Sequence, residues 1–259
     1  MNIGLALSGG GMRGVVHIGA IKALEEHHIF PTHIAGTSSG SVVGALYAYG
    51  YRCEEILRFF KEINVLDFKK YAINKPGLMD AEKFYPYFKS YLKIDNFSVL
   101  KKHLSLTATN ILNGKLEVFN NGELIKPVLA SAAVPGIFAP VKIKDSYYID
   151  GGVLNNFPID LLKPTCKKTI GVYVNNLNSI TITDLRHSYN VIERAFNIKS
   201  RGEDLKKFSN CDLVISPNGL TKYGLFDKKN LNDIYNLGYE STKIALIKEN
   251  VLSETTMVD

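Results

Sequence analysis

The stretch His33-Ile34-Ala35-Gly36-Thr37-Ser38-Ser39-Gly40-Ser41-Val42-Val43 places one serine between two glycines, where a short apolar run gives way to a helix-like run. This spacing is typical of a nucleophile elbow, the tight strand-to-helix turn that presents a serine hydroxyl above a sheet. We expect glycine to be required at 36 and 40, because a side chain there would collide with the neighbouring strand or helix. Ser38 would lie at a helix N-terminus, whose dipole favours developing negative charge. The stretch therefore predicts a reactive serine at the carboxyl edge of a β-sheet.

The residues before this turn predict a strand, a glycine loop and a helix. Residues 3–7 are apolar, residues 8–14 are rich in glycine, and residues 15–28 carry apolar side chains at helical spacing. Together with a strand at 33–35 they form a strand-helix-strand unit, for which we expect parallel pairing and a right-handed crossover. Downstream we predict helices at 39–49, 54–63, 81–91, 124–133 and 183–208, and strands at 104–111, 115–119, 141–143, 146–149, 169–174 and 212–215.

The glycine loop allows two interpretations. Gly9, Gly11 and Gly14 match the G-x-G-x-x-G pattern of dinucleotide-binding loops. That interpretation requires an acidic residue at the end of the second strand to bind a ribose, and residues 36–38 contain no carboxylate. The other interpretation is an oxyanion hole, in which backbone N–H groups face the oxygen of a tetrahedral intermediate. Adjacent parallel strands carry their loops to the same edge of a sheet, so we favour the oxyanion hole.

A reactive serine also needs a base, and the histidines are poorly placed for this role. Only His187 follows the chain order serine, aspartate, histidine of a common triad, and it lies in a polar, helix-like segment. The better candidate is Asp150, which ends the strand-like residues 147–149 and precedes two glycines. Asp-Gly-Gly alone is a common turn. Combined with the serine turn and the glycine loop, it predicts a carboxylate near Ser38, whose proton affinity rises in a partly desolvated pocket.

Three sequence boxes occur in a fixed order along the chain. They are Leu-Ala-Leu-Ser-Gly-Gly-Gly-Met-Arg-Gly at residues 5–14, Gly-Thr-Ser-Ser-Gly at 36–40 and Asp-Gly-Gly at 150–152. In this order and at this spacing the boxes resemble the patatin-like phospholipase family. The resemblance is strong over residues 1–174 and fades afterwards, with further similarity at residues 130–138 and 152–158.

The resemblance implies an α/β fold, a three-layer α/β/α sandwich with a mainly parallel central sheet. It also implies a Ser-Asp dyad without histidine, with Ser38 as nucleophile and Asp150 as base. The other implied site residues form the oxyanion hole, the elbow and the Asp-Gly-Gly motif: Gly9, Gly10, Gly11, Met12, Arg13 and Gly14; Gly36 and Gly40; Gly151 and Gly152. Two positions depart from the usual family pattern, because Ser8 stands where many members have aspartate and Ser39 where alanine is commoner. Neither change removes a group that the mechanism uses.

The activity implied by the resemblance is hydrolysis of a lipid ester through an acyl-enzyme, of phospholipase A, lysophospholipase or carboxylesterase type. It requires no metal and no cofactor. An acyltransferase that uses the same acyl-enzyme, and a non-catalytic lipid-binding scaffold, remain alternatives. The loop-rich segment after the elbow helix carries six apolar residues that either belong to the ordinary core or line an acyl pocket or lid: Leu66, Phe68, Tyr71, Ile73, Leu78 and Met79.

The composition is that of an ordinary globular protein of 259 residues, with 46% hydrophobic residues, 22% charged residues and a net charge of +6. No linker or repeat divides the chain, so we expect one domain over residues 1–259, with a motif-bearing core at about 3–175 and its completion at 176–259. Lysines and arginines are dispersed, which argues against nucleic acid as a partner and leaves open transient contact with an anionic membrane surface. The three cysteines are far apart, which favours a reducing compartment. We expect a cytoplasmic protein, at most peripheral at a membrane, because we find no signal peptide and no apolar run of about 20 residues.

Overall fold

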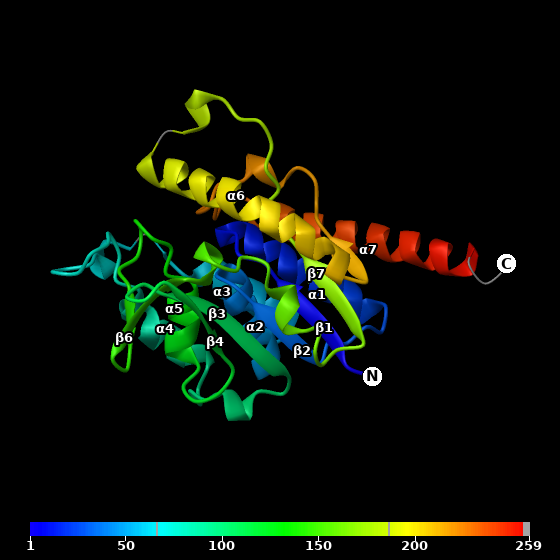
Figure 1. The fold of residues 1–259 in the computed structure, drawn as a ribbon, viewed down its shortest axis with the longest axis horizontal. Helices are drawn as coiled ribbons and strands as arrows, with labels where there is room; N and C mark the ends of the chain where they lie inside the picture. The colour runs from blue at the N-terminus through cyan, green and yellow to red at the C-terminus, as the bar shows by residue number, and fades with distance from the viewer. Residues whose placement is uncertain (66, 186, 256–259) are drawn as a thin grey trace.

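The computed structural model describes residues 1–65, 67–185 and 187–255. These residues fold around one eight-stranded sheet (Figure 1). Five neighbouring strands run parallel in the order β3-β2-β1-β7-β8. The other three pair antiparallel at the β3 end: β4 and β6 with β3, and β5 with β6. The strands are β1 (Ile3–Leu7), β2 (His33–Gly36), β3 (His103–Asn110), β4 (Lys115–Phe119), β5 (Val141–Ile143), β6 (Ser146–Asp150), β7 (Lys168–Val172) and β8 (Leu213–Ile215).

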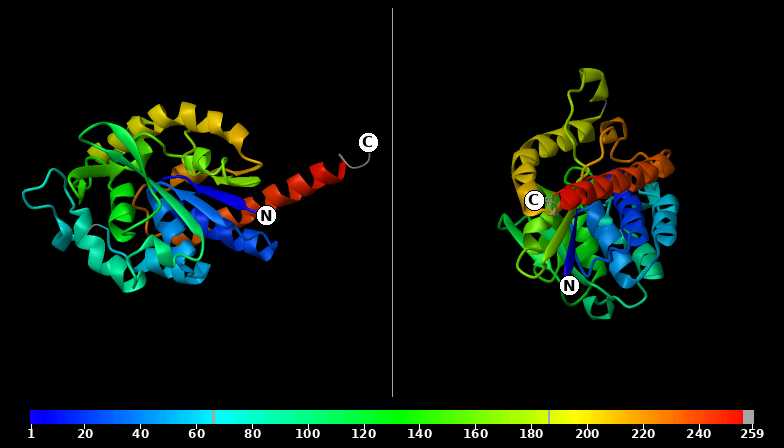
Figure 2. Two further views of the ribbon diagram at one scale, coloured as in Figure 1. Left: turned by 60° about the horizontal axis from the view of Figure 1, so that its bottom comes forward. Right: turned by 90° about the vertical axis from the view of Figure 1, so that its right-hand side faces the viewer.

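Helices lie on both sides of the sheet. α1 (Val15–Glu26), α2 (Ser39–Tyr49) and α7 (Leu231–Thr255) lie on one side, where α7 packs along α1, and α6 (Ser188–Lys206) lies on the other (Figure 2). The remaining helices are α3 (Cys53–Glu62), α4 (Tyr85–Tyr91) and α5 (Ile125–Ser131). This arrangement confirms the expected α/β/α sandwich with a mainly parallel sheet.

β1 and α2, the two elements that carry the glycine loop and the serine turn, are almost wholly buried. Residues 4–7 of β1 and residues 39–48 of α2 are buried. α3 is strongly amphipathic, and its buried face presents Ile56, Phe59 and Phe60 to the rest of the core. Ser38 therefore lies at the junction of two buried elements, with aromatic side chains of α3 close by.

Most predicted elements are confirmed, with small shifts at their ends. The hairpin predicted at Asn113-Gly114 joins β3 to β4, and Gly114 has φ of +69°. The predicted helix at 183–208 is shorter, because a separate 3-10 turn at Ile182–Asp184 precedes α6, which begins at Ser188. In the described part of the chain, no helix is both long and apolar enough to cross a membrane.

Candidate active site

Ser38 occupies the sharp turn between β2 and α2. Its φ of +55° and ψ of −123° are unusual for a residue with a side chain, and it is the N-terminal cap residue of α2. A Cβ at Gly36 would stand 2.6 Å from the carbonyl oxygen of Gly40, and a Cβ at Gly40 would collide with the Leu7 carbonyl. The Ser38 N–H donates to Ser131 Oγ at 3.0 Å, which ties the turn to α5. The turn thus has the geometry of a nucleophile elbow.

The register of β3 explains how Asp150 comes to lie beside this turn. β2 pairs with residues 103–106 of β3, β4 with residues 106–110 and β6 with residues 108–110. A strand has two edges, so β2 and β6 must share the edge that β4 does not occupy. β2 runs parallel to β3 and β6 antiparallel, so the carboxyl ends of β2 and β6 point toward each other. Ser38 follows one end and Asp150 forms the other.

Asp150 is buried, with 5% of its surface exposed. The Gly152 N–H donates to Oδ1 at 2.7 Å, and the Ser38 hydroxyl lies close enough to the carboxylate to stabilise its charged form. Burial raises the pKa of Asp150 to about 6, while the nearby Ser38 hydroxyl and the Gly152 N–H act in the opposite direction. The carboxylate can therefore accept a proton near neutral pH and still be ionised there.

The glycine loop lies above the same edge and has two amide groups unengaged. The Gly9 N–H donates to the Asn156 carbonyl at 3.2 Å, and the Met12 N–H donates to the Leu225 carbonyl at 2.9 Å. Arg13 and Gly14 belong to the 3-10 turn Gly11–Gly14.

Among the described residues, no protein acceptor is found for the N–H of Gly10 or Gly11. Of the six predicted oxyanion-hole residues, these two have the amide groups best suited to the role, since the N–H groups of Gly9 and Met12 are already engaged.

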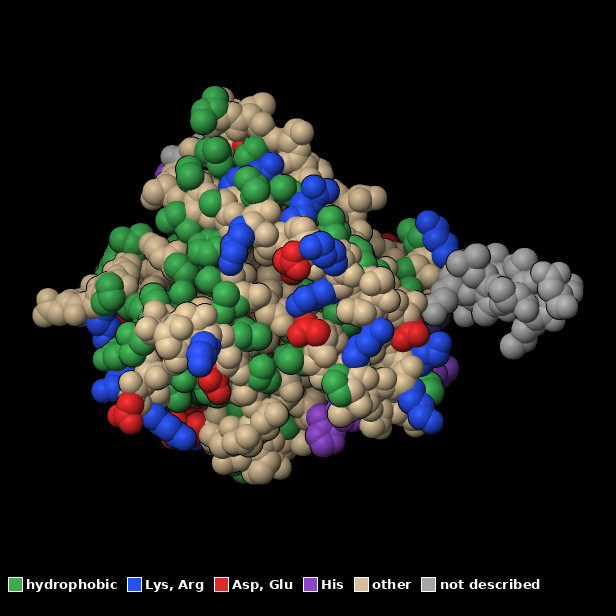
Figure 3. All heavy atoms as spheres, in the orientation of Figure 1, with side chains coloured by type: hydrophobic (Ala, Val, Ile, Leu, Met, Phe, Trp, Pro, Cys, Tyr) green, Lys and Arg blue, Asp and Glu red, His purple; other side chains and the backbone are tan. Residues whose placement is uncertain are grey.

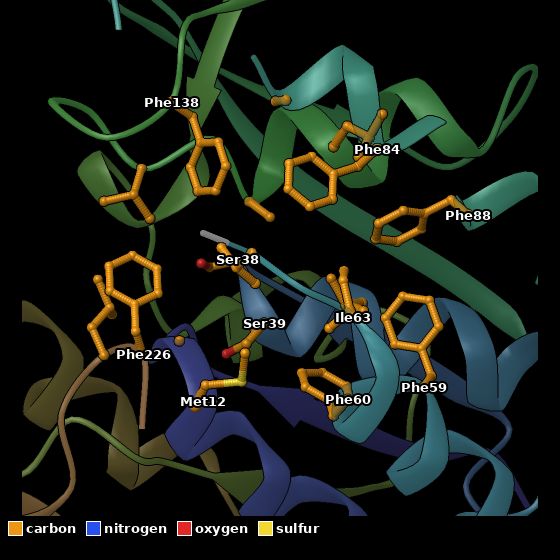
Figure 4. A pocket seen from close by; sticks show the side chains of 18 residues that line it. Met12, Ser38, Ser39, Phe59, Phe60, Ile63, Phe84, Phe88, Phe138 and Phe226 are labelled. Atoms are coloured by element: carbon orange, nitrogen blue, oxygen red, sulfur yellow. The ribbon is translucent and has the colours of Figure 1, made fainter. Parts of the chain in front are cut away.

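An apolar chamber opens on one side of Ser38 (Figure 4). It encloses about 740 Å³, part of it open to solvent. Its walls come from the glycine loop, from α2, α3, α4 and α5, and from the turns near residues 81–84, 134–138 and 225–226. Labelled in Figure 4 are Met12, Ser38, Ser39, Phe59, Phe60, Ile63, Phe84, Phe88, Phe138 and Phe226.

Of the six residues considered for an acyl pocket at 66–79, the four whose side chains the structure describes do not form one. Tyr71, Ile73, Leu78 and Met79 do not line this chamber. Tyr71, Ile73 and Leu78 are exposed, and Met79 packs instead against Ile137 and Leu225. Leu66 and the side chain of Phe68 lie outside the described part of the structure. The wall comes instead from the amphipathic helices before and after this segment, whose buried faces were predictable but whose common cavity was not.

A second chamber of about 470 Å³, part of it open to solvent, lies on the other side of Ser38, under α6; its wall is mixed but more polar than that of the first, and we call it the polar chamber. Its wall includes Ser38, Asp150 and Gly9–Gly11, and it continues across side chains from distant parts of the chain: Arg13, Asn156, Asn175, Glu193, Asn197 and Ser200. Sequence reasoning missed the contribution of α6. The available signal was the spacing of Glu193, Asn197, Ser200 and Asp204, which puts four polar residues on one face of a helix.

Histidine is absent from both chamber walls within the described residues. His17 is buried near the glycine loop, where its Nε2 lies 2.8 Å from the Ser8 carbonyl. Burial lowers the pKa of His17 to about 4, so the ring is neutral and donates this hydrogen bond. Over residues 1–65, 67–185 and 187–255, no three His, Cys, Asp or Glu side chains are grouped as a metal site would require.

Comparison with known proteins places this site in a family. The model of the Patatin family, described as patatin-like phospholipase, matches residues 5–163, which include Ser38 and Asp150. "Probable lipid hydrolase 463L" of Invertebrate iridescent virus 6 is 34% identical over 61% of this chain and 62% of its own length. "Lysophospholipase NTE1" of Scheffersomyces stipitis is 30% identical over 69% of this chain and 12% of its own.

The chain spans 66% of the length of a curated relative from Acanthamoeba polyphaga mimivirus, and 44% of the length of the mycobacterial relatives that it matches. Among solved structures, VipD from Legionella pneumophila shares the fold, with a TM-score of 0.57 and 15% identity over 96% of this chain and 67% of that one. The matched family model covers more than half of the chain and includes all three sequence boxes. This chain belongs to the patatin-like phospholipase family.

Proposed function

We propose that the protein is a serine-dependent lipid acyl hydrolase of phospholipase A, lysophospholipase or carboxylesterase type, with Ser38 as nucleophile and Asp150 as base. The observation that carries this proposal is the placement of Ser38 beside a buried carboxylate, Asp150, at the point where an apolar and a polar chamber meet. The names of the viral and yeast relatives, a lipid hydrolase and a lysophospholipase, support it.

Acylation begins when a lipid ester places its acyl chain in the apolar chamber and its alcohol portion in the polar chamber. Asp150 takes the Ser38 proton as Oγ attacks the acyl carbonyl. The negative charge that develops on the carbonyl oxygen is stabilised by the N–H groups of Gly10 and Gly11 and by the N-terminus of α2. The tetrahedral intermediate then collapses, the ester C–O bond breaks, and protonated Asp150 returns its proton to the departing alcohol.

Deacylation repeats these steps with water. Asp150 accepts a proton from a water molecule in the polar chamber, and the hydroxide attacks the acyl carbonyl on Ser38. Collapse of the second intermediate releases the fatty acid, and Ser38 recovers its proton from Asp150. A histidine is unnecessary in this scheme, because a carboxylate with a pKa of about 6 carries out both proton transfers.

The apolar chamber favours substrates with a long hydrocarbon chain. Its wall consists almost entirely of aromatic and aliphatic side chains, so an acyl chain leaves water without leaving polar protein groups unpaired. Such substrates reside in membranes or micelles, and we expect the protein to contact a lipid surface transiently.

The test is release of fatty acid from a lysophospholipid, quantified by mass spectrometry, for the wild type, Ser38→Ala and Ser39→Ala. Ser39 is a matched control, because its hydroxyl lies beside the same chamber and makes no hydrogen bond to a described residue. We expect Ser39→Ala to keep activity within a few-fold and Ser38→Ala to lose it. Ser38→Ala with wild-type turnover would refute the proposed nucleophile.

A further inference from the structure

The peptide between Gly10 and Gly11 determines where one of the two unengaged N–H groups points. Glycine on both sides leaves this peptide free to rotate, because no Cβ restricts the backbone torsions next to it. A half-turn would remove the Gly11 N–H from the chambers and present the Gly10 carbonyl oxygen in its place. An oxygen at that position would repel the developing oxyanion.

Arg13 holds this peptide in one orientation. Its Nε–H donates to the Gly10 carbonyl oxygen at 3.2 Å. Because a peptide is planar and trans, its C=O and N–H point in opposite directions. Fixing the Gly10 carbonyl on the guanidinium therefore fixes the Gly11 N–H on the opposite side. Gly11 lines both chambers together with Ser38.

The far end of the Arg13 side chain is anchored in turn by residues that lie far away in the sequence. Its Nη2 donates to Glu193 Oε1 at 2.6 Å and to Asn175 Oδ1 at 3.1 Å. The Arg13 and Glu193 side chains are 8% and 16% exposed, so water screens the pair little. Without Glu193, a nearly buried guanidinium would lose its charged partner and the geometry that depends on it.

We infer that Glu193 is a positioning residue that keeps the oxyanion hole assembled, acting from α6 through Arg13. This inference rests on the proposed function. Glu193 lies outside the residues that the family model matches. The carboxylate that anchors Arg13 therefore comes from the part of the chain where the family resemblance fades. In this arrangement α6 has two roles. It forms part of the wall of the polar chamber, and its Glu193 carboxylate determines which way a backbone amide in the glycine loop faces.

The test compares a soluble oxoester with the corresponding thionoester for the wild type, Glu193→Ala, Glu193→Gln and Glu203→Ala. Sulfur accepts hydrogen bonds weakly, so the preference for the oxoester measures how well the N–H groups face the reacting atom. Glu203 is the matched control, because it is an exposed glutamate on the same helix whose partner is Lys206 at 2.8 Å.

We expect Glu193→Ala to lower kcat for the oxoester about 10- to 100-fold, with KM changed less than about threefold and the preference over the thionoester reduced by a similar factor to kcat. Glu193→Gln should fall between this variant and the wild type, and Glu203→Ala should match the wild type. The thermal midpoint of each variant separates this effect from loss of folding.

A Glu193→Ala enzyme with wild-type kcat, or with both esters slowed equally, overturns the inference and leaves the proposed function intact. A KM effect alone would mean that Glu193 contacts substrate instead, and would also overturn it. A wild type that hydrolyses neither ester refutes the proposed function itself.

Discussion

The two chambers that meet at Ser38 are stabilised by different interactions: burial of apolar side chains in one, and hydrogen bonds between polar side chains in the other. The walls of the apolar chamber come largely from α3, α4 and neighbouring turns, and pack by burial of aromatic rings. The polar chamber joins side chains up to 180 residues apart, such as Arg13 and Glu193, through individual hydrogen bonds. An apolar wall tolerates exchange of one hydrophobe for another of similar volume. A polar wall loses its geometry when one partner is removed, because the other is left buried and unpaired.

The largest effect should arise at the boundary between the chambers. Asp150→Asn keeps an acceptor for the Gly152 N–H but removes the base, so we expect kcat to fall by about 10³-fold or more on any ester. Steady-state kinetics with a soluble ester measure this. Activity within tenfold of the wild type would show that Asp150 is not the base.

The pH profile tests the same carboxylate without a mutation. Because the pKa of Asp150 is raised to about 6, the fraction able to accept a proton falls as the pH drops below 6. We expect kcat/KM to be level above pH 7, half-maximal near pH 6 and to fall about tenfold for each further pH unit. A profile centred near pH 4 would contradict the environment described for this group.

Burial of Asp150 should also cost stability at neutral pH. An aspartate in the unfolded chain has a pKa near 4, so between pH 4 and 6 the folded protein binds a proton that the unfolded chain has released. Stability therefore decreases as pH rises through this range, by roughly 2–3 kcal/mol for this group.

Asp150→Asn removes that dependence. We expect its free energy of unfolding, relative to the wild type, to increase by this amount between pH 4 and pH 8 in denaturant titrations. A difference that stays constant with pH would mean that the carboxyl is well solvated.

A change of volume in the apolar chamber should alter only the preference for chain length. Val42 lies on α2, one turn beyond Ser38. It lines the apolar chamber but not the polar one. We expect Val42→Phe to slow hydrolysis of long-chain esters about tenfold relative to an acetate ester, because the ring occupies space that the chain needs. Asn197→Ala, in the polar chamber, is the control and should leave the chain-length profile unchanged. If the two variants showed the same chain-length profile, the acyl chain would have to bind outside the apolar chamber.

The smallest effect concerns the support of the elbow. Ser131→Ala removes the acceptor for the Ser38 N–H, leaving a buried donor unpaired. We expect a loss of about 1–3 kcal/mol in the free energy of unfolding and a decrease in kcat of a few-fold. A stability equal to that of the wild type would indicate that water replaces the serine hydroxyl.

The part of the site that could be predicted from the sequence is the part encoded by local patterns. The strand, glycine loop, helix and elbow of residues 3–49 follow from apolar spacing and glycine positions, and all of these elements are present. Asp150 was a candidate from its place at a strand end, with the family resemblance supporting it. Its approach to Ser38 depends on β6 sharing an edge of β3 with β2, which no local pattern reveals.

The rest of the site depends on contacts between distant segments. Periodicity indicated that the helices around residues 54–63 and 81–91 bury one face, but not that both faces border one cavity beside Ser38. The bonds of Arg13 to Asn175 and Glu193 span 162 and 180 residues, and no sequence spacing predicts such partners. The single-domain prediction for residues 1–259 stays a prediction.

The most direct test of the Ser-Asp dyad is intact mass after incubation with a fluorophosphonate probe, for the wild type, Ser38→Ala and Asp150→Asn. We predict one adduct on the wild type, none on Ser38→Ala and a strongly slowed reaction on Asp150→Asn. Folded wild type without an adduct, or an adduct that persists in Ser38→Ala, would contradict the assignment of Ser38 as the nucleophile.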